Sequence, residues 1–383
     1  MEPNQQFIQN LIRSRKAKGL SQKNLADALG CALSFIQRIE RGKTVPDMEV
    51  IFAIAKALDV MSYELFQEIR ELRSVRFRSY KKINPALRET ILAHAAVDLD
   101  SFLFLEDLLE DKIQFRLANI IKRGHFQSPA EAARQCRKEL GLNLTEPIYD
   151  ICGLMEKSGV KVIPLSIPSD DFFALSIGPT DGGPAVVLNV WEKITLERQI
   201  FSLAHELGHL VLHPDDYVQG LPEGTKDDKK QEKEANSFAG HFLMPNDGFF
   251  QEWKKYHGMS FVNNVLKVKC VFHVSYQTVL YRLYENSKFK NFSAFRVRFM
   301  TDFETIYGYK LGHKDDPPCH SPEYCNVQTP EPFESPRINF FDGRFKLLLR
   351  KALSQGKISI SRAAEILRFS MEKMRDLVFS WRY

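Results

Sequence analysis

Residues 201–213 read FSLAHELGHLVLH and constrain the fold of this chain more than any other stretch. At the helical spacing of about 100° per residue, the apolar side chains form one stripe and His205 and His209 lie on roughly the opposite side. The stripe consists of Leu203, Leu207, Leu210 and Val211. We therefore expect a helix over residues 195–213 whose leucines pack into a core while its histidines face a cleft.

His205, Glu206 and His209 have the spacing H-E-x-x-H. Residues four apart on a helix are neighbours, so two imidazoles can bind one zinc ion, with Glu206 within reach of a bound water. A catalytic zinc site also needs a third protein ligand and an open position. His213 lies eight residues after His205, about 12 Å along the helix axis, which is too far for a shared ion. Asp215 occupies the position where a metzincin has its third histidine.

The sequence KKQEKEANSFAGHFLMP predicts a second helix, ended by Pro245, that can supply the third ligand. Glu232 and Asn236 are four apart and share a face, whereas Glu234 points away from both. We favour Glu232 over Glu234 as the ligand. Asn236 is then placed to orient another ligand from behind.

QIFSLAHELGHLVLH followed by EKEANSFAGHFLMP resembles the ImmA/IrrE family of zinc metallopeptidases, as do VKVIP and PAVVLN upstream. The resemblance is close over about residues 147–250 and supports one Zn²⁺ ion on His205, His209 and Glu232. Glu206 is then the catalytic base that takes a proton from water and passes it to the leaving amine. Three residues are candidates for stabilising the oxyanion, but a structural role is favoured for each of them: Tyr217, His213 and His241.

Residues 7–66 predict four short amphipathic helices that close one small core. Pro46 precedes the fourth helix. The helices are separated by Gly19, Ser21, Gly30 and Gly42. LSQKNLADALG, SFIQRIERGKTVPD and IFAIAKALDV resemble the Xre/Cro-type DNA-binding domain of repressors. The resemblance implies a recognition helix over Ala32 to Arg41.

Several residues of this domain are candidates for contacts with double-stranded DNA. Those expected at base edges are Leu33, Ser34, Gln37 and Arg38, and those expected at phosphates are the amide of Gln22 and Lys43. The alternative is a helical protein-interaction module in which Arg38 and Lys43 are only solvated. The first 90 residues hold 16 Lys and Arg against 10 Asp and Glu, an excess of six in a chain of net charge +5. We therefore expect nucleic-acid affinity at the N-terminus.

The expected fold class is α+β and mostly helical. The predicted domains are a helix-turn-helix domain (1–68), a helical linker region (69–146), a zincin-like peptidase domain (147–290) and a loop and helical C-terminal region (291–383). The peptidase domain is expected to combine the HExxH helix with a small antiparallel sheet of three runs, VKVIPLSI, FFALSIG and PAVVLN. PAVVLN is a candidate edge strand for pairing with substrate.

Other segments carry expectations of their own. Residues 67–82, rich in arginine and lysine, predict a solvated helix face, with added phosphate contacts as the alternative, and residues 99–121 predict one long helix. FHVSYQTVLYRLYE predicts either a second helix-turn-helix or, as favoured, further helical packing of the peptidase domain. The C-terminal helices suit partner docking or a homodimer.

The six scattered cysteines predict reduced thiols rather than a disulfide framework. Cys319, His320 and Cys325 form a C-H-x-x-x-x-C pattern without the tight cysteine spacing of structural zinc sites, so a second metal site there is disfavoured. The sequence has neither a transmembrane run nor a signal peptide, which predicts a cytoplasmic protein without a membrane partner.

The predicted function is a DNA-binding regulator with zinc-dependent endopeptidase activity. Its expected substrate is a partner helix-turn-helix repressor, or another regulatory protein, in a stress or mobile-element and phage response. Two alternatives remain open: a transcription factor whose peptidase-like domain is a sensor with little proteolysis, and a toxin or phage-defence component.

Overall fold

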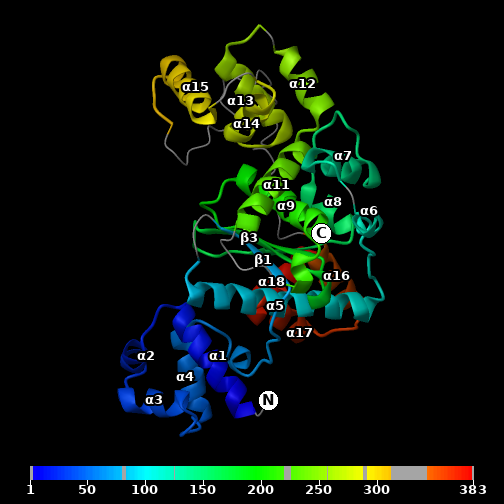
Figure 1. Ribbon diagram of the computed structural model, residues 1–383. Helices are drawn as coiled ribbons and strands as arrows, with labels where there is room; N and C mark the ends of the chain where they lie inside the picture. The colour runs from blue at the N-terminus through cyan, green and yellow to red at the C-terminus, as the bar shows by residue number, and fades with distance from the viewer. Residues whose placement is uncertain are drawn as a thin grey trace. The chain divides into compact units, whose positions relative to one another are not determined.

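The computed structural model shows a mostly helical chain with one four-stranded sheet (Figure 1), which confirms the predicted α+β class. It describes residues 3–79, 83–124, 126–219, 226–256, 258–287, 291–311 and 343–381. The backbone divides into two compact units, each built from separate segments of the chain. Unit 1 comprises Met1–Leu72, Lys81–Glu110 and Leu348–Tyr383, and unit 2 comprises Arg73–Tyr80 and Asp111–Leu347.

Unit 1 begins with the four short helices that the glycine and serine pattern predicts. They are α1 (Pro3–Ala17), α2 (Gln22–Ala28), α3 (Leu33–Glu40) and α4 (Met48–Leu58), followed by the 3-10 turn η1 (Ser62–Leu65). Ser21 caps α2 by accepting a hydrogen bond from the amide of Asn24, and Asp47 caps α4 through the amide of Val50. Their apolar faces close one small core around Leu25, Ile36 and Ile54.

Later segments complete unit 1. These are α5 (Pro85–Leu109), α17 (Ile360–Leu367), α18 (Met371–Ser380) and most of α16 (Arg344–Ser354). The single long helix predicted for residues 99–121 is wrong, because α5 ends at Glu110 in the left-handed conformation and α6 (Ala118–Arg123) starts separately. The break falls at Glu110 and Asp111, and residues 99–121 contain no glycine or proline that would mark the end of a helix.

The sheet of unit 2 has the order β1-β3-β4-β2. Its strands are β1 (Val75–Ser79), β2 (Lys161–Leu165), β3 (Phe172–Ile177) and β4 (Ala185–Asn189). The helix face predicted over residues 67–82 is therefore wrong at β1, where V-R-F-R-S alternates with the period of a strand. β4 pairs antiparallel with β3 but parallel with β2, so the sheet is mixed and not antiparallel throughout. PAVVLN is consequently an inner strand, and the prediction that it forms an edge is wrong.

The remaining helices of unit 2 pack against this sheet or against one another. They are α7 (Pro129–Glu139), α8 (Ile151–Lys157), α9 (Leu196–Leu212), α10 (Asp216–Gln219), α11 (Lys226–Leu243), α12 (Asn246–Lys255), α13 (Phe261–Phe272), α14 (Tyr276–Glu285) and α15 (Phe292–Tyr307), with the 3-10 turn η2 at Pro179–Asp181. α9 packs against α11 on one side and against β3 on the other. Its apolar stripe belongs to the large core of this unit.

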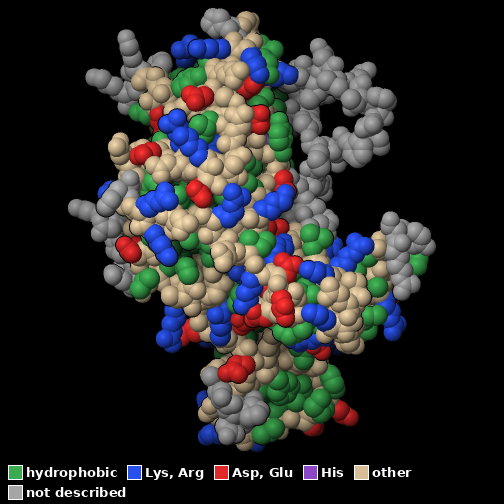
Figure 2. Space-filling model, turned by 90° about the vertical axis from the view of Figure 1, so that its right-hand side faces the viewer, with side chains coloured by type: hydrophobic (Ala, Val, Ile, Leu, Met, Phe, Trp, Pro, Cys, Tyr) green, Lys and Arg blue, Asp and Glu red, His purple; other side chains and the backbone are tan. Residues whose placement is uncertain are grey.

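Figure 2 shows Lys and Arg side chains spread over the viewed face, with hydrophobic side chains gathered at the lower end, at the height where Figure 1 draws α1–α4. Val45, Met48 and Phe52 are exposed apolar side chains of this N-terminal domain. Among the described residues, no helix combines the length and the apolar character needed to cross a membrane.

Candidate metal centre

α9 carries the H-E-x-x-H residues as the sequence predicts. Thr195 caps its N-terminus through the amide of Arg198, and His213 ends it. Leu203 and Leu207 are buried in the core. His205 and His209 are also almost fully buried, although they lie opposite the leucine stripe. Another element must therefore cover this side of the helix. That element is α11.

The structure brings together the three residues predicted as metal ligands. Nε2 of His205 and Nε2 of His209 are 3.0 Å apart. The carboxylate of Glu232 on α11 faces both, with Oε2 3.3 Å from Nε2 of His205 and Oε1 3.1 Å from Nε2 of His209. The three ligand atoms lie within 4.8 Å of one another. Two imidazoles and one carboxylate are the donor set of a catalytic zinc site.

The electrostatics of the cluster favour metal-binding protonation states. Burial lowers the pKa of His205 to about 4, and burial also lowers the pKa of His209 well below its usual value. Burial alone would raise the pKa of Glu232, but its hydrogen bonds with the two histidines hold that pKa below its usual range. Neutral imidazoles beside an ionised carboxylate are the forms that bind a metal ion.

Each histidine has a partner behind its ring. Oδ1 of Asn236 lies 3.0 Å from Nδ1 of His205, in the place that the sequence predicts for this amide. Nδ1 of His209 lies 3.1 Å from Nδ1 of His213. The other nitrogen of His213, Nε2, is 3.0 Å from Oε2 of Glu234. His213 and Glu234, the two rejected ligand candidates, therefore form a polar chain behind His209, which the sequence did not reveal.

Glu206 is fully buried and has one occupied and one vacant carboxylate oxygen. Ser176 Oγ on β3 donates a hydrogen bond of 2.5 Å to Oε2, and the same hydroxyl lies 2.7 Å from the hydroxyl of Tyr217. Within the described part of the chain, Oε1 has no hydrogen-bond partner. Burial raises the pKa of Glu206 to about 8. Such a carboxyl can both accept and return a proton near neutral pH.

Ser176 and Arg76 are two residues of this site that sequence reasoning missed. Ser176 is the single polar residue in the buried strand FFALSI, and that isolation is a usable signal. Arg76 on β1 contacts Asp216, donates to Oε1 of Gln231 at 2.7 Å, and lies 3.7 Å from Oε1 of Glu232. It therefore joins the sheet to the helix that supplies the third donor.

Gly208, inside the H-E-L-G-H sequence, allows α9 and α11 to approach closely. A Cβ at this position would lie 3.0 Å from the ring of Phe238 and 3.3 Å from the backbone of Ala235. Both contacts are on α11, three and six residues after Glu232. The glycine thus contributes to placing the carboxylate over the histidines.

A cavity of 630 Å³ adjoins the cluster, and Asn236 contributes to both. Its lining mixes aromatic and cationic side chains, which include Phe173, Phe201, Tyr281, Arg78, Lys193, Arg198, Lys233 and Arg282. Two of its acidic residues face cations: Glu285 accepts from Arg282, and Glu197 pairs with the buried Lys269.

The three candidates for oxyanion stabilisation make other contacts. Tyr217 contacts Ser176, His213 contacts His209 and Glu234, and His241 lies 2.7 Å from Nη1 of Arg282. These contacts agree with the structural roles favoured from the sequence. Cys319, His320 and Cys325 lie outside the described residues.

Four of the six predicted DNA contacts are exposed on and beside α3, and the two glutamines are only partly exposed. Leu33, Ser34, Arg38 and Lys43 are exposed, and Gln37 is half-buried. The side-chain amide of Gln22 instead donates a 2.6 Å hydrogen bond to Oε2 of Glu40, a carboxylate that also pairs with Arg15.

Comparisons with known proteins find two separate family matches in the chain. Residues 155–284 match the family described as IrrE N-terminal-like domain, a peptidase family, and residues 11–65 match the family described as Helix-turn-helix. No curated protein matches the chain. A solved structure, a Mycobacterium tuberculosis transcriptional regulator, is 18% identical over 48% of this chain and 51% of its own length, with a TM-score of 0.30. The chain thus spans about half of that regulator. The two family matches show an N-terminal helix-turn-helix domain followed by an IrrE-like domain of a peptidase family, in the order that the sequence predicts.

Proposed function

We propose that this protein is a DNA-binding regulator with zinc-dependent endopeptidase activity, and that it hydrolyses a partner regulatory protein such as a helix-turn-helix repressor. The observation that carries this proposal is the convergence of His205, His209 and Glu232 beside the vacant Oε1 of Glu206. A stress or mobile-element response is the expected setting.

The residues present fit a zinc ion. Two neutral imidazoles and one carboxylate supply three donors, and Asn236 and His213 fix the histidine rings from behind. A buried carboxylate oxygen without a protein partner, Oε1 of Glu206, is the feature expected where a water molecule must be activated. When bound, zinc supplies Lewis-acid polarisation of the scissile carbonyl and lowers the pKa of water to about 7.

The chain's own residues perform the proton transfers. Ser176 occupies Oε2 of Glu206 and thereby leaves Oε1 to take the proton from the attacking water. Because burial raises the pKa of this carboxyl to about 8, the protonated form can pass its proton to the leaving amine. Tyr217 keeps the Ser176 hydroxyl in place.

The substrate is proposed to bind as an extended segment. β1 is an edge strand of the sheet and carries Arg76 and Arg78. The positive charges of these two residues act on the pKa of Glu206 in the opposite sense to burial. An extended chain can pair with such an edge, while its side chains enter the neighbouring 630 Å³ cavity. The cations along that cavity favour a segment with acidic and aromatic residues.

DNA binding is proposed for the N-terminal domain. α3 presents Leu33, Ser34, Gln37 and Arg38 to base edges, and Lys43 contacts a phosphate. The bond between Gln22 and Glu40 orients the Gln22 side chain inside the domain, so a phosphate contact by its amide requires that bond to exchange.

The decisive experiment co-expresses the protein with a repressor encoded beside its gene, as wild type and as Glu206→Gln. Cleavage of the repressor by the wild type alone supports the peptidase function. If both forms leave every candidate intact while the wild type still represses a promoter, the sensor alternative replaces it. Growth arrest that depends on Glu206 without any cleaved regulator would favour the toxin alternative.

A further inference from the structure

The last described segment of the chain, most of which belongs to unit 1, is basic. Residues 343–381 hold nine Lys and Arg against three Asp and Glu, an excess of six within 39 residues. This segment folds as α16, α17 and α18. Its charge is that of a surface for an anionic partner.

The turn between α17 and α18 has the geometry of the turn between α2 and α3. Each corresponding residue is numbered 338 higher, as in Ser359 for Ser21. Both serines cap the first helix, with the amides of Asn24 and Arg362 donating at 3.0 and 3.1 Å. Gly30 and Arg368 are both left-handed, with φ of 64° and 54°. The next amides, Cys31 and Phe369, donate to the carbonyls of Ala26 and Ala364 at 3.0 and 2.9 Å.

Burial follows the same correspondence. The alanines that accept these turn bonds, Ala26 and Ala364, are both buried. Ile36 on α3 and Met374 on α18 are both fully buried, at 0% exposure. At the start of the second helix, Leu33 and Met371 are exposed by 38% and 39%. The helix pair α17 and α18 thus has the same cap, the same turn, the same inward-facing positions and the same exposed start of the second helix as the pair α2 and α3.

α13 and α14 have a similar turn, at His273, but their second helix is covered. The alanine position is occupied there by Lys269, which is buried in an ion pair with Glu197. α14 packs on α15 and lines the large cavity of unit 2. In α18, by contrast, Met374 is the one described residue that is buried.

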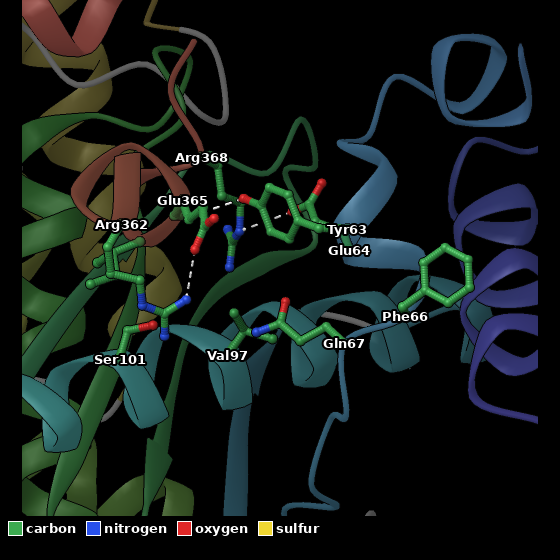
Figure 3. Close-up of a pocket in the computed structure, with 10 residues that line it drawn as sticks. Tyr63, Glu64, Phe66, Gln67, Val97, Ser101, Arg362, Glu365 and Arg368 are labelled. Atoms are coloured by element: carbon green, nitrogen blue, oxygen red, sulfur yellow. Dashed lines mark hydrogen bonds and ion pairs between the residues drawn. The ribbon is translucent and has the colours of Figure 1, made fainter. Parts of the chain in front are cut away.

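The turn of α17 and α18 is fixed within unit 1 by charged contacts (Figure 3). Nη2 of Arg368 lies 2.6 Å from Oδ1 of Asp98 on α5, and its Nε is 3.4 Å from Oε1 of Glu64. The hydroxyl of Tyr63 donates to the carbonyl of Glu365 at 3.1 Å. Arg368 adopts the left-handed conformation, which is uncommon for a residue other than glycine. The carboxylates of Asp98 and Glu64 hold its side chain. The first helix is thus anchored while the second remains open.

We propose that α17 and α18 form a second helix-turn-helix that contacts double-stranded DNA, with α18 as its groove-facing helix. Lys373 and Arg375 are the exposed cations of α18, and Arg375 corresponds to Gln37 of α3. Glu372 and Asp376, which correspond to Ser34 and Arg38, balance these two cations within the helix. The phosphate contacts of α18 therefore fall to Lys373 and Arg375, and the excess positive charge comes from the rest of the segment. The basic segment around it provides the charge complementarity to DNA.

The test measures the affinity of the full chain for a long mixed-sequence duplex as a function of salt, by fluorescence anisotropy. The variant is Lys373→Gln with Arg375→Gln. Its matched control is Lys122→Gln with Arg123→Gln, which removes two exposed cations from α6 of unit 2. Because each lost phosphate contact lowers the slope of log K against log salt by about 0.9, the α18 variant is expected to lose about 1.8 while the control keeps the wild-type slope.

An unchanged slope and affinity in the folded α18 variant would overturn the proposal. So would unchanged DNA binding together with an altered sedimentation coefficient, which would make α18 a protein contact. A third variant, Arg38→Gln with Lys43→Gln, tests the N-terminal helix separately. If that variant loses affinity while the α18 variant does not, the second element fails and the first stands.

Discussion

Oδ1 of Asn236 on α11 lies 3.0 Å from Nδ1 of His205 on α9. An amide oxygen at this distance accepts a hydrogen bond from the Nδ1 proton, which leaves the lone pair of Nε2 directed at His209 and Glu232. The same helix that supplies the carboxylate donor therefore also sets the tautomer of the first histidine. α9 and α11 form the site as one unit.

Replacement of Asn236 by alanine is expected to weaken zinc binding by about 10- to 100-fold, because the ring of His205 loses its orienting partner. Competition with a chromophoric chelator measures the affinity. Ser237→Ala is the matched control, since this neighbour on α11 lines the cavity without contacting a ligand ring. Equal zinc affinity in the wild type and in Asn236→Ala would contradict the orienting role.

Glu232 and Glu234 offer a second test within one helix. Glu232→Gln is expected to abolish retention of one zinc ion through dialysis, because a neutral amide replaces the charged donor. Glu234→Gln removes the partner of His213 and an exposed ion pair with Lys230, and it is expected to retain the ion. Zinc content and the shift of Tm on chelation report both outcomes. Zinc loss in the Glu234 variant alone would reverse the assignment of the third ligand.

The sequence was sufficient for the parts of the site that depend on helical spacing. His205 and His209 are one turn apart on α9, and Glu232 and Asn236 are one turn apart on α11, so each pair shares a face. Local signals also gave helix boundaries, because Ser21 and Thr195 cap helix starts and Gly30 adopts the left-handed conformation after a helix end.

What the sequence could not supply depends on contacts between distant segments. β1 joins the sheet from a position more than 80 residues before β2, and its arginines masked the alternation that marks a strand. The parallel pairing of β2 with β4 depends on strand order, which hydrophobic pattern does not encode. The bond from Ser176 to Glu206 likewise requires β3 to lie under α9.

Gly208→Ala is expected to destabilise unit 2 by about 1–3 kcal/mol and to weaken zinc binding, because the added methyl group must displace the backbone of α11 at Ala235. Thermal denaturation and zinc titration measure the two effects. Gly258→Ala is the control, because a Cβ at this exposed glycine would have no described atom within 4 Å. A Gly208→Ala protein with the Tm and zinc affinity of the wild type would show that the close approach of the helices is not required.

The buried ion pair between Lys269 on α13 and Glu197 on α9 predicts a large stability effect remote from the metal ligands. Their charged atoms are 2.6 Å apart, and the Lys269 side chain is fully buried. Glu197→Gln removes this negative charge from beside the buried ammonium and is expected to cost roughly 3 kcal/mol of unfolding free energy. Adding Lys269→Met should restore most of it, because the double variant buries no charge. Urea denaturation measures both, with Asp302→Asn, from the exposed pair with Arg298, as the control that leaves the midpoint unchanged. A Glu197→Gln protein as stable as this control would show that Lys269 does not depend on the carboxylate.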